Sequence, residues 1–216
     1  MNPICKLFLL TTAVISSVQT LQFNSSGYFT IVQFTDIHVG PDETKNSLTQ
    51  ELQRNILSWI NPDLVVISGD AVRTSDPVAP GWFEDQWDKF TAPMVEAQIP
   101  YAYALGNHDD EGDLTRRQIV RLDQTNPYSL RNKSEGIPDT ANFRIPVYAS
   151  QNGSQLVAHL WVLDSGSYGC GDLLTGYGCI ESDVVDWYNE ESLNLKLNME
   201  LMSTTLLISI SLFQNI

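Results

Sequence analysis

The chain has 216 residues, enough for one substantial domain with its own core. A hydrophobic content of 43% with 18% charged residues is typical of a globular protein and excludes a disordered one. The net charge of −14 argues against nucleic acid as a partner, because phosphate backbones are bound by Lys and Arg. An anionic substrate would also be repelled, so its site needs local cations.

Residues 1–20 have the pattern of a secretory signal peptide. Lys6 supplies the positive start, residues 7–18 are short and mostly apolar, and small residues follow. The apolar stretch is too short to span a bilayer. We therefore expect a cleaved signal, no stable membrane span, and secretion or delivery to the vacuolar or endomembrane lumen. An uncleaved anchor and a buried N-terminal strand are the alternatives.

Strand and helix patterns alternate from residue 29 onwards. Continuous apolar runs predict buried strands at 29–35, 64–67 and 101–105. Helical spacing of apolar residues predicts helices at 46–60, 82–98 and 113–123. The first helix should bury one apolar face, and the second should bend or break near Pro93. The face expected to be buried consists of Leu48, Leu52, Ile56 and Ile60. This β-α-β-α-β order predicts an α/β fold with a parallel core.

The second half of the chain has fewer signals. Residues 142–149 and 156–163 predict a β-hairpin, because Asn152-Gly153 between them is a favoured two-residue turn. Residues 181–191 predict a helix. His159 lies within an apolar strand pattern, which favours a core histidine over a ligand. Asp164 ends the same strand pattern. It could either hold in place a residue that binds a ligand or cap a loop.

Two cysteines remain after removal of a signal that contains Cys5. Cys170 and Cys179 lie in a glycine-rich stretch, and an oxidising compartment favours a disulfide between them, with two free thiols as the alternative. Closing such a loop would contribute about 2–3 kcal/mol. Acceptor sequons for N-glycosylation begin at Asn24, Asn132 and Asn152, all in polar or turn-like surroundings.

Polar blocks follow each of the three predicted parallel strands. Taken singly, each block could be an ordinary turn or loop cap. The carboxyl ends of parallel strands meet at one edge of a sheet, which is where functional groups gather in open α/β sheets. Together, the blocks therefore predict a shared site. They read Asp36-Ile37-His38, Gly69-Asp70 and Gly106-Asn107-His108-Asp109.

The chemistry of these blocks suits two metal ions. Asp36 and His38 are two positions apart on an extended chain, so both side chains point the same way and can reach one ion. Asp70 can bridge two ions through its two oxygens, and Asn107 offers an amide oxygen to the second. Ligands of the His and Asp type suit Zn, Fe or Mn better than Ca.

The two remaining residues of the third block are the predicted catalytic pair. His108 should point toward whatever is bound and protonate a leaving oxygen or stabilise its charge. Asp109 is expected to hold the His108 ring and favour its charged form. Arg116 and Arg117 could meet a phosphate, although a solvated helix face is the stronger reading.

The three blocks resemble the first three signature blocks of the calcineurin-like metallophosphoesterases. Residues 161–166 and 177–180 are similar to a secreted or vacuolar branch that is purple-acid-phosphatase-like. The resemblance covers about 28–191 and implies a four-layer α-β-β-α sandwich and hydrolysis of small phosphorylated substrates, monoesters before diesters. It also implies two metal ions beside His108. One ion would be held by Asp36, His38 and Asp70, and the other by Asp70 and Asn107.

Two departures from the family pattern bear on function. His38 stands where purple acid phosphatases usually have Gly, and no Tyr follows Asp70 closely, so iron–tyrosinate chemistry is not implied. The family also takes histidine ligands from two later blocks, whereas this chain has three histidines and none after His159. Residues 192–216 form an atypical hydrophobic tail, so we expect a fold that is incomplete at the C-terminus, with a hydrophobic anchor signal as the alternative.

These observations predict a metal-dependent phosphate ester hydrolase. Because late histidine ligands are missing, the second metal should be held weakly. The alternatives are a catalytically inactive secreted binding protein on the same fold and a fragment without a function of its own.

Overall fold

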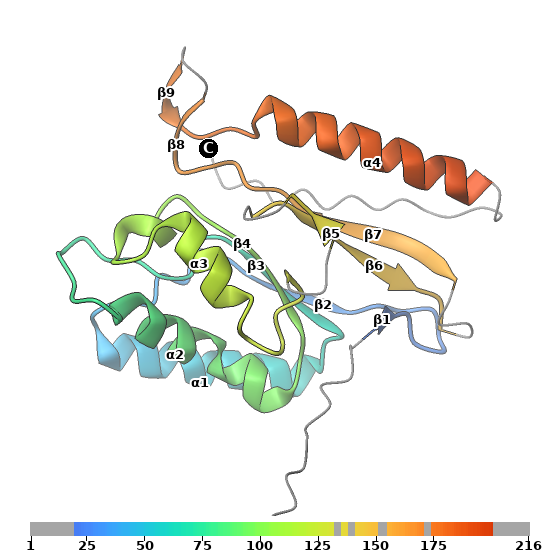
Figure 1. Cartoon of the computed structure of the whole chain (residues 1–216). Helices are drawn as coiled ribbons and strands as arrows, with labels where there is room; N and C mark the ends of the chain where they lie inside the picture. Colours follow the sequence, from blue (N-terminus) through green and yellow to red (C-terminus); the bar gives the residue numbers. More distant parts are fainter. Residues whose placement is uncertain (1–19, 132–134, 138–140, 151–154, 171–173, 201–216) are drawn as a thin grey trace, which may run out of the picture.

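The computed structural model describes residues 20–131, 135–137, 141–150, 155–170 and 174–200. Its elements form four layers (Figure 1). Three helices cover one face of a three-stranded sheet, a four-stranded sheet packs on its other face, and a long helix covers the second sheet. The predicted α/β sandwich of the α-β-β-α type is thus confirmed for the described residues.

The first sheet is the predicted parallel core. Strands β2, β3 and β4 lie side by side in chain order, and every residue of β3 and β4 is buried. The two faces of β3 pack into different hydrophobic cores. Val65 lies in the core between this sheet and the helices, and Val66 lies in the core between the two sheets. The strands span Ile31–Phe34 (β2), Leu64–Ser68 (β3) and Tyr101–Ala104 (β4).

Three helices connect or follow these strands: α1 (Glu43–Ile60), α2 (Trp82–Ala97) and α3 (Arg116–Asp123). The expected break near Pro93 is wrong, since α2 continues through this residue. Helix α3 begins later than predicted, because Thr115 caps it in a capping box with Gln118. Asp113 instead accepts hydrogen bonds from the N–H groups of Gly81 and Phe83 at the start of α2.

Helix α1 buries a different face from the one predicted. Leu48 and Leu52 are 62% and 58% exposed, whereas Asn46, Gln53 and Leu57 are buried toward α2. The polar contact is specific, since the Asn46 amide donates to the Gly40 carbonyl at 2.7 Å and to Gln86 at 3.1 Å. Apolar periodicity alone missed this face because two of its buried side chains are amides, of which Asn46 finds polar partners.

The second sheet contains β1 (Leu21–Gln22), β5 (Glu135–Gly136), β6 (Phe143–Tyr148) and β7 (Leu156–Val162). The predicted antiparallel pairing of β6 with β7 is confirmed, although the expected turn lies outside the described residues. The short strands β1 and β5 carry no periodic signal and were missed.

Helix α4 (Ser182–Glu200) covers the outer face of the second sheet, where Trp187 and Tyr188 pack on Trp161. The prediction that this helix ends at residue 191 is wrong, because it continues nine residues into the segment assigned to the tail. Residues 201–216 lie outside the described part of the chain. Within the described part, no helix combines the length and apolar character needed to cross a bilayer.

Several further predicted features can be located. The sulfur atoms of Cys170 and Cys179 are bonded, and the bridge joins the hairpin of β8 (Tyr168–Cys170) and β9 (Leu174–Tyr177) to the segment before α4. Asn24 is exposed, and its side-chain oxygen accepts the N–H groups of Ser26 and Tyr28. Asn132, Asn152 and residues 1–19 of the expected signal lie outside the described residues.

His159 is a core residue, as predicted. It is 1% exposed, on the face of β7 opposite to Ala158 and Leu160, and neither ring nitrogen has a hydrogen-bond partner among the described residues. Burial, and then the positive charge of Arg144, lower the His159 pKa from 6.5 to about 4. Arg144 in turn pairs with Glu191 of α4 at 3.1 Å.

This burial predicts acid sensitivity. Because the folded protein favours neutral His159, its contribution to stability is complete above about pH 6.5 and is lost as pH falls toward 4. The full loss is on the order of 3 kcal/mol. In urea titrations between pH 7 and 4, His159→Phe should remove this part of the pH dependence. Parallel curves for wild type and variant would contradict the prediction.

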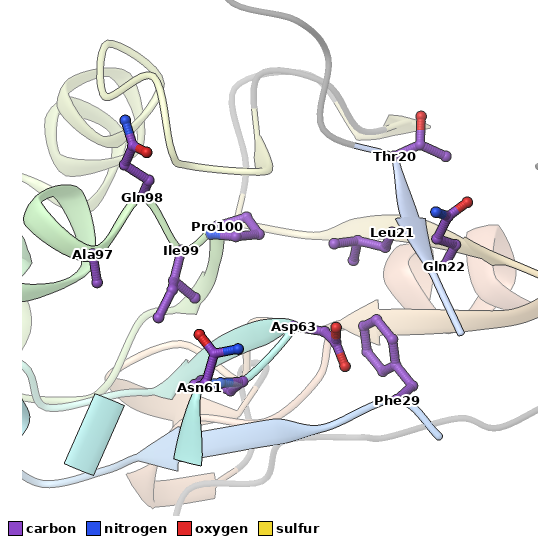
Figure 2. A pocket seen from close by; sticks show the side chains of 11 residues that line it. Thr20, Leu21, Gln22, Phe29, Asn61, Asp63, Ala97, Gln98, Ile99 and Pro100 are labelled. Atoms are coloured by element: carbon purple, nitrogen blue, oxygen red, sulfur yellow. The ribbon is translucent and has the colours of Figure 1, made fainter. Parts of the chain in front are cut away.

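Figure 2 shows a pocket at the amino ends of the parallel strands, with a volume of about 410 Å³. Residues that precede β2, β3 and β4 line it, among them Phe29, Asp63 and Pro100. The Asp63 carboxylate accepts a hydrogen bond from the Thr30 N–H at 2.7 Å. This pocket is therefore at the opposite end of the sheet from the three polar blocks.

Candidate metal centre

The first block leaves the sheet through two left-handed residues. Asp36 and His38 have φ angles of 53° and 54°, so they are not on an extended chain. The prediction that their side chains point the same way because strand residues alternate is therefore based on a wrong backbone conformation. The two side chains nevertheless converge. Backbone hydrogen bonds from Asp36 N to Gly69 O (3.2 Å) and from His38 N to Asp70 O (2.9 Å) hold the first block along the second.

Asp70 is the central residue of the site. It has a φ angle of 51° and is only 3% exposed. Its Oδ1 accepts the His108 N–H at 2.9 Å, and its Oδ2 lies 3.4 Å from Nε2 of His38. Asp36, His38 and Asp70 each offer a ligand atom, and these atoms all lie within 4.8 Å of one another. The structure thus brings together three of the predicted ligands.

These three residues fit a metal ion. Left-handed conformations of residues other than glycine cost on the order of 1–3 kcal/mol each and persist where the surroundings enforce them. Here all three potential ligands have this conformation, and together they bring two carboxylates within a few ångström. Two carboxylates and an imidazole that converge in this way are a donor set for a cation, which would offset the repulsion between the carboxylates.

The third block lies against this cluster. Asn107 and His108 are half-buried on the loop after β4, and the hydrogen bond from the His108 backbone to Asp70 fixes that loop to the second block. The rings of His108 and His38 lie edge to face with centroids 5.3 Å apart. The predicted catalytic histidine is therefore beside the predicted ligands.

Asp109 does not have its predicted role. Its buried carboxylate accepts three backbone N–H groups, from Asp70 (3.0 Å), Val72 (3.0 Å) and Gly106 (2.7 Å). Burial raises the Asp109 pKa, and the hydrogen bonds from Val72 and Gly106 oppose the rise. The expectation that Asp109 holds the His108 ring is wrong. Both carboxylate oxygens of Asp109, a residue of the third block, accept backbone N–H groups of the second block or next to it.

The ring of His108 instead contacts Glu111, a residue that the sequence analysis missed. Nδ1 of His108 lies 2.6 Å from Oε1 of Glu111. The available signal was spacing: residues three apart lie on the same side of a 3₁₀ turn, and η1 spans Asp109–Glu111.

Arg116 and Asp164 connect the third block to the second sheet. Arg116 donates to the Gly106 carbonyl at 2.6 Å and forms an ion pair with Asp164 at the end of β7. A weaker pair joins Arg116 to Asp110 at 3.5 Å. The expected solvated position of Arg116 is therefore wrong. Asp164 has both of its expected roles, since it supports the site through Arg116 and also caps its own loop by accepting the Gly166 N–H at 2.9 Å.

A second pocket of about 250 Å³ borders the cluster. His38 forms part of its lining, together with Asp42 and Lys45 at the start of α1 and Arg73 after the second block. The pocket thus offers two cationic side chains next to the candidate ligands. A Cβ at Gly40, which also lines the pocket, would lie 2.7 Å from the Arg73 carbonyl oxygen, so only glycine permits this approach.

Comparison with known proteins agrees with this geometry. Residues 29–204 match the family described as calcineurin-like phosphoesterase. The chain is 27% identical to "Phosphatase DCR2" of Saccharomyces cerevisiae, with 90% of this chain and 37% of that protein covered. It is 32% identical to "Probable inactive purple acid phosphatase 14" of Arabidopsis thaliana, with 80% and 48% covered.

A further relative, "Probable inactive purple acid phosphatase 29" of Arabidopsis thaliana, is 25% identical, with 82% of this chain and 50% of that protein covered. The chain thus spans between about a third and a half of the length of these relatives. The family match includes all three polar blocks, both sheets from β2 onwards and α4. The chain belongs to the calcineurin-like phosphoesterase family.

Proposed function

We propose that this chain contributes metal ligands to a two-metal phosphate ester hydrolase that acts on small phosphorylated substrates, on monoesters in preference to diesters. The observation that carries the proposal is the convergence of Asp36, His38 and Asp70 at one edge of the parallel sheet, next to His108. One ion would be held by these three ligands and a second by Asp70 and Asn107. Fe, Zn and Mn suit such ligands.

Each residue has a definite part in this proposal. Ions held by Asp36, His38, Asp70 and Asn107 would supply an activated water at neutral pH and neutralise phosphate charge. His108 donates a proton to the leaving oxygen, from a ring placed beside the ligands. Lys45 and Arg73 in the adjoining pocket attract the anionic substrate locally, which a chain of net charge −14 needs.

We also propose that the protein enters the secretory route. The Cys170–Cys179 disulfide suits an oxidising compartment, and Asn24 lies exposed. We therefore propose secretion or delivery to the vacuolar or endomembrane lumen, with glycosylation at Asn24, Asn132 and Asn152.

A non-catalytic binding protein is the second candidate function. Two of the relatives named above are called probable inactive purple acid phosphatases, which supports this candidate. His159 is not a ligand at this site, because it is buried on the face of β7 that bears Trp161. On this reading, the chain binds metal and phosphate without turnover.

Metal content per chain, with turnover of 4-nitrophenyl phosphate, tests the proposal. We expect bound metal and turnover in the wild type. In Asp70→Asn, both should fall by more than the roughly 10–100-fold that loss of an outer-sphere partner costs. Asp63→Asn is the matched control, because Asp63 lies at the opposite end of the same strand and keeps an acceptor for Thr30. Metal without turnover supports the binding protein, and no metal in the wild type overturns both functions.

A further inference from the structure

His108 and Glu111 form a close pair beside the candidate metal centre. Nδ1 of His108 lies 2.6 Å from Oε1 of Glu111, and the Glu111 N–H donates to the His108 carbonyl at 3.1 Å. Both contacts arise within one short turn, so the backbone itself brings the carboxylate to the ring. The side chains are 20% and 30% exposed, which leaves the pair partly shielded from water.

The acceptor decides which ring nitrogen carries the proton. A carboxylate can only accept, so the short contact requires a hydrogen on Nδ1 of His108. Nε2 is then the nitrogen left to face a bound group: it is bare in the neutral ring, and it carries the proton to be delivered when both ring nitrogens are protonated. Hydrogen bonding at one nitrogen also fixes the orientation of the ring.

Arg73 restrains the second oxygen of Glu111. Its Nε lies 3.7 Å from Oε2, and its own backbone N–H donates to Val39 at 3.0 Å. Glu111 therefore lies between a residue after the second block and the histidine of the third. Among the described residues, no other carboxylate lies within hydrogen-bond distance of the His108 ring.

We propose that Glu111 is a positioning residue that holds His108 in the tautomer with hydrogen on Nδ1, and that Arg73 keeps Glu111 in place. Its catalytic consequence rests on the proposed function: the proton that His108 delivers to the leaving oxygen is a second one, carried on Nε2, and the hydrogen bond at Nδ1 keeps Nε2 directed at the bound group. The tautomer itself is a property of the folded chain and does not depend on turnover.

Nitrogen NMR of the full chain with ¹⁵N-labelled histidine tests the tautomer directly. The chain has only three histidines, and His108→Gln identifies the signals of His108. We expect hydrogen on Nδ1 in the wild type, a shift toward hydrogen on Nε2 in Glu111→Ala, and a smaller shift in Arg73→Ala. Glu96→Ala, which removes an exposed glutamate paired with Arg54, should leave the His108 signals unchanged.

The catalytic part is tested with two substrates in the same variants. Glu111→Ala should lower kcat about 10–100-fold for an alkyl phosphate, with KM little changed. The loss should be smaller for 4-nitrophenyl phosphate, whose leaving group needs no proton. Glu111→Asp should restore part of the loss.

The outcomes separate the two proposals. If His108 keeps its tautomer in Glu111→Ala, or already carries its hydrogen on Nε2 in the wild type, the role of Glu111 is wrong. If the tautomer shifts as expected but neither wild type nor variants turn over either substrate, the positioning role is supported and the proposed hydrolase activity fails. An equal loss of kcat for both substrates would overturn the catalytic part alone.

Discussion

Replacing Asp109 by alanine is expected to destabilise the protein by about 3 kcal/mol or more, because three buried backbone donors each lose their acceptor. The donors belong to Asp70, Val72 and Gly106, so the loss falls on the junction of two of the three blocks. Metal affinity should fall as well, since the left-handed conformation of Asp70 is enforced by this junction.

Urea unfolding and metal content of the purified variant check this expectation. Asp110→Ala is the matched control. Asp110 is adjacent to Asp109 in sequence, but its carboxylate makes only a long, partly exposed ion pair with Arg116, at 3.5 Å. That change should cost less than about 1 kcal/mol and spare the metal. Equal losses of stability in the two variants would contradict the structural role assigned to Asp109.

The sequence predicted the location of the site better than its internal geometry. Continuous apolar runs such as 64–67 are unambiguous signals for buried strands, and parallel strands bring their carboxyl ends to one edge. Asp36, His38, Asp70 and His108 were found in this way. The left-handed turns that join them were not predicted, because Asp and His adopt a positive φ angle only occasionally, whereas glycine does so readily.

The errors share a cause, which is that burial and partners depend on packing. Asp109 follows His108 directly, and sequence proximity alone suggested that the two interact. In the fold, its carboxylate turns inward to backbone donors while Glu111 reaches the ring. Helix α1 shows the same effect, since Asn46 is buried with partners and Leu48 is exposed.

The largest stability effect away from the site is expected from Asp123→Ala. Asp123 is fully buried, and its carboxylate accepts from Arg131 Nε (2.8 Å), the Tyr101 hydroxyl (2.9 Å) and the Ser129 hydroxyl (3.0 Å). Arg131 also donates to the Tyr103 carbonyl, and its guanidinium lies 4.5 Å from the ring centroid of Phe143. The pair therefore connects α3 and β4 to the second sheet.

Loss of one member of such a buried pair costs about 3–5 kcal/mol, because the other charge stays buried without its counter-ion. Urea unfolding at neutral pH should show this loss for Asp123→Ala. The exposed pair of Arg54 and Glu96 provides the control, and Glu96→Ala should cost less than about 1 kcal/mol. Replacing both members, Asp123→Leu with Arg131→Met, should cost less than Asp123→Ala alone, since no unpaired charge remains. If the double variant is less stable than the single one, the hydrogen bonds of this network stabilise the junction of the two sheets more than the pairing of its charges does.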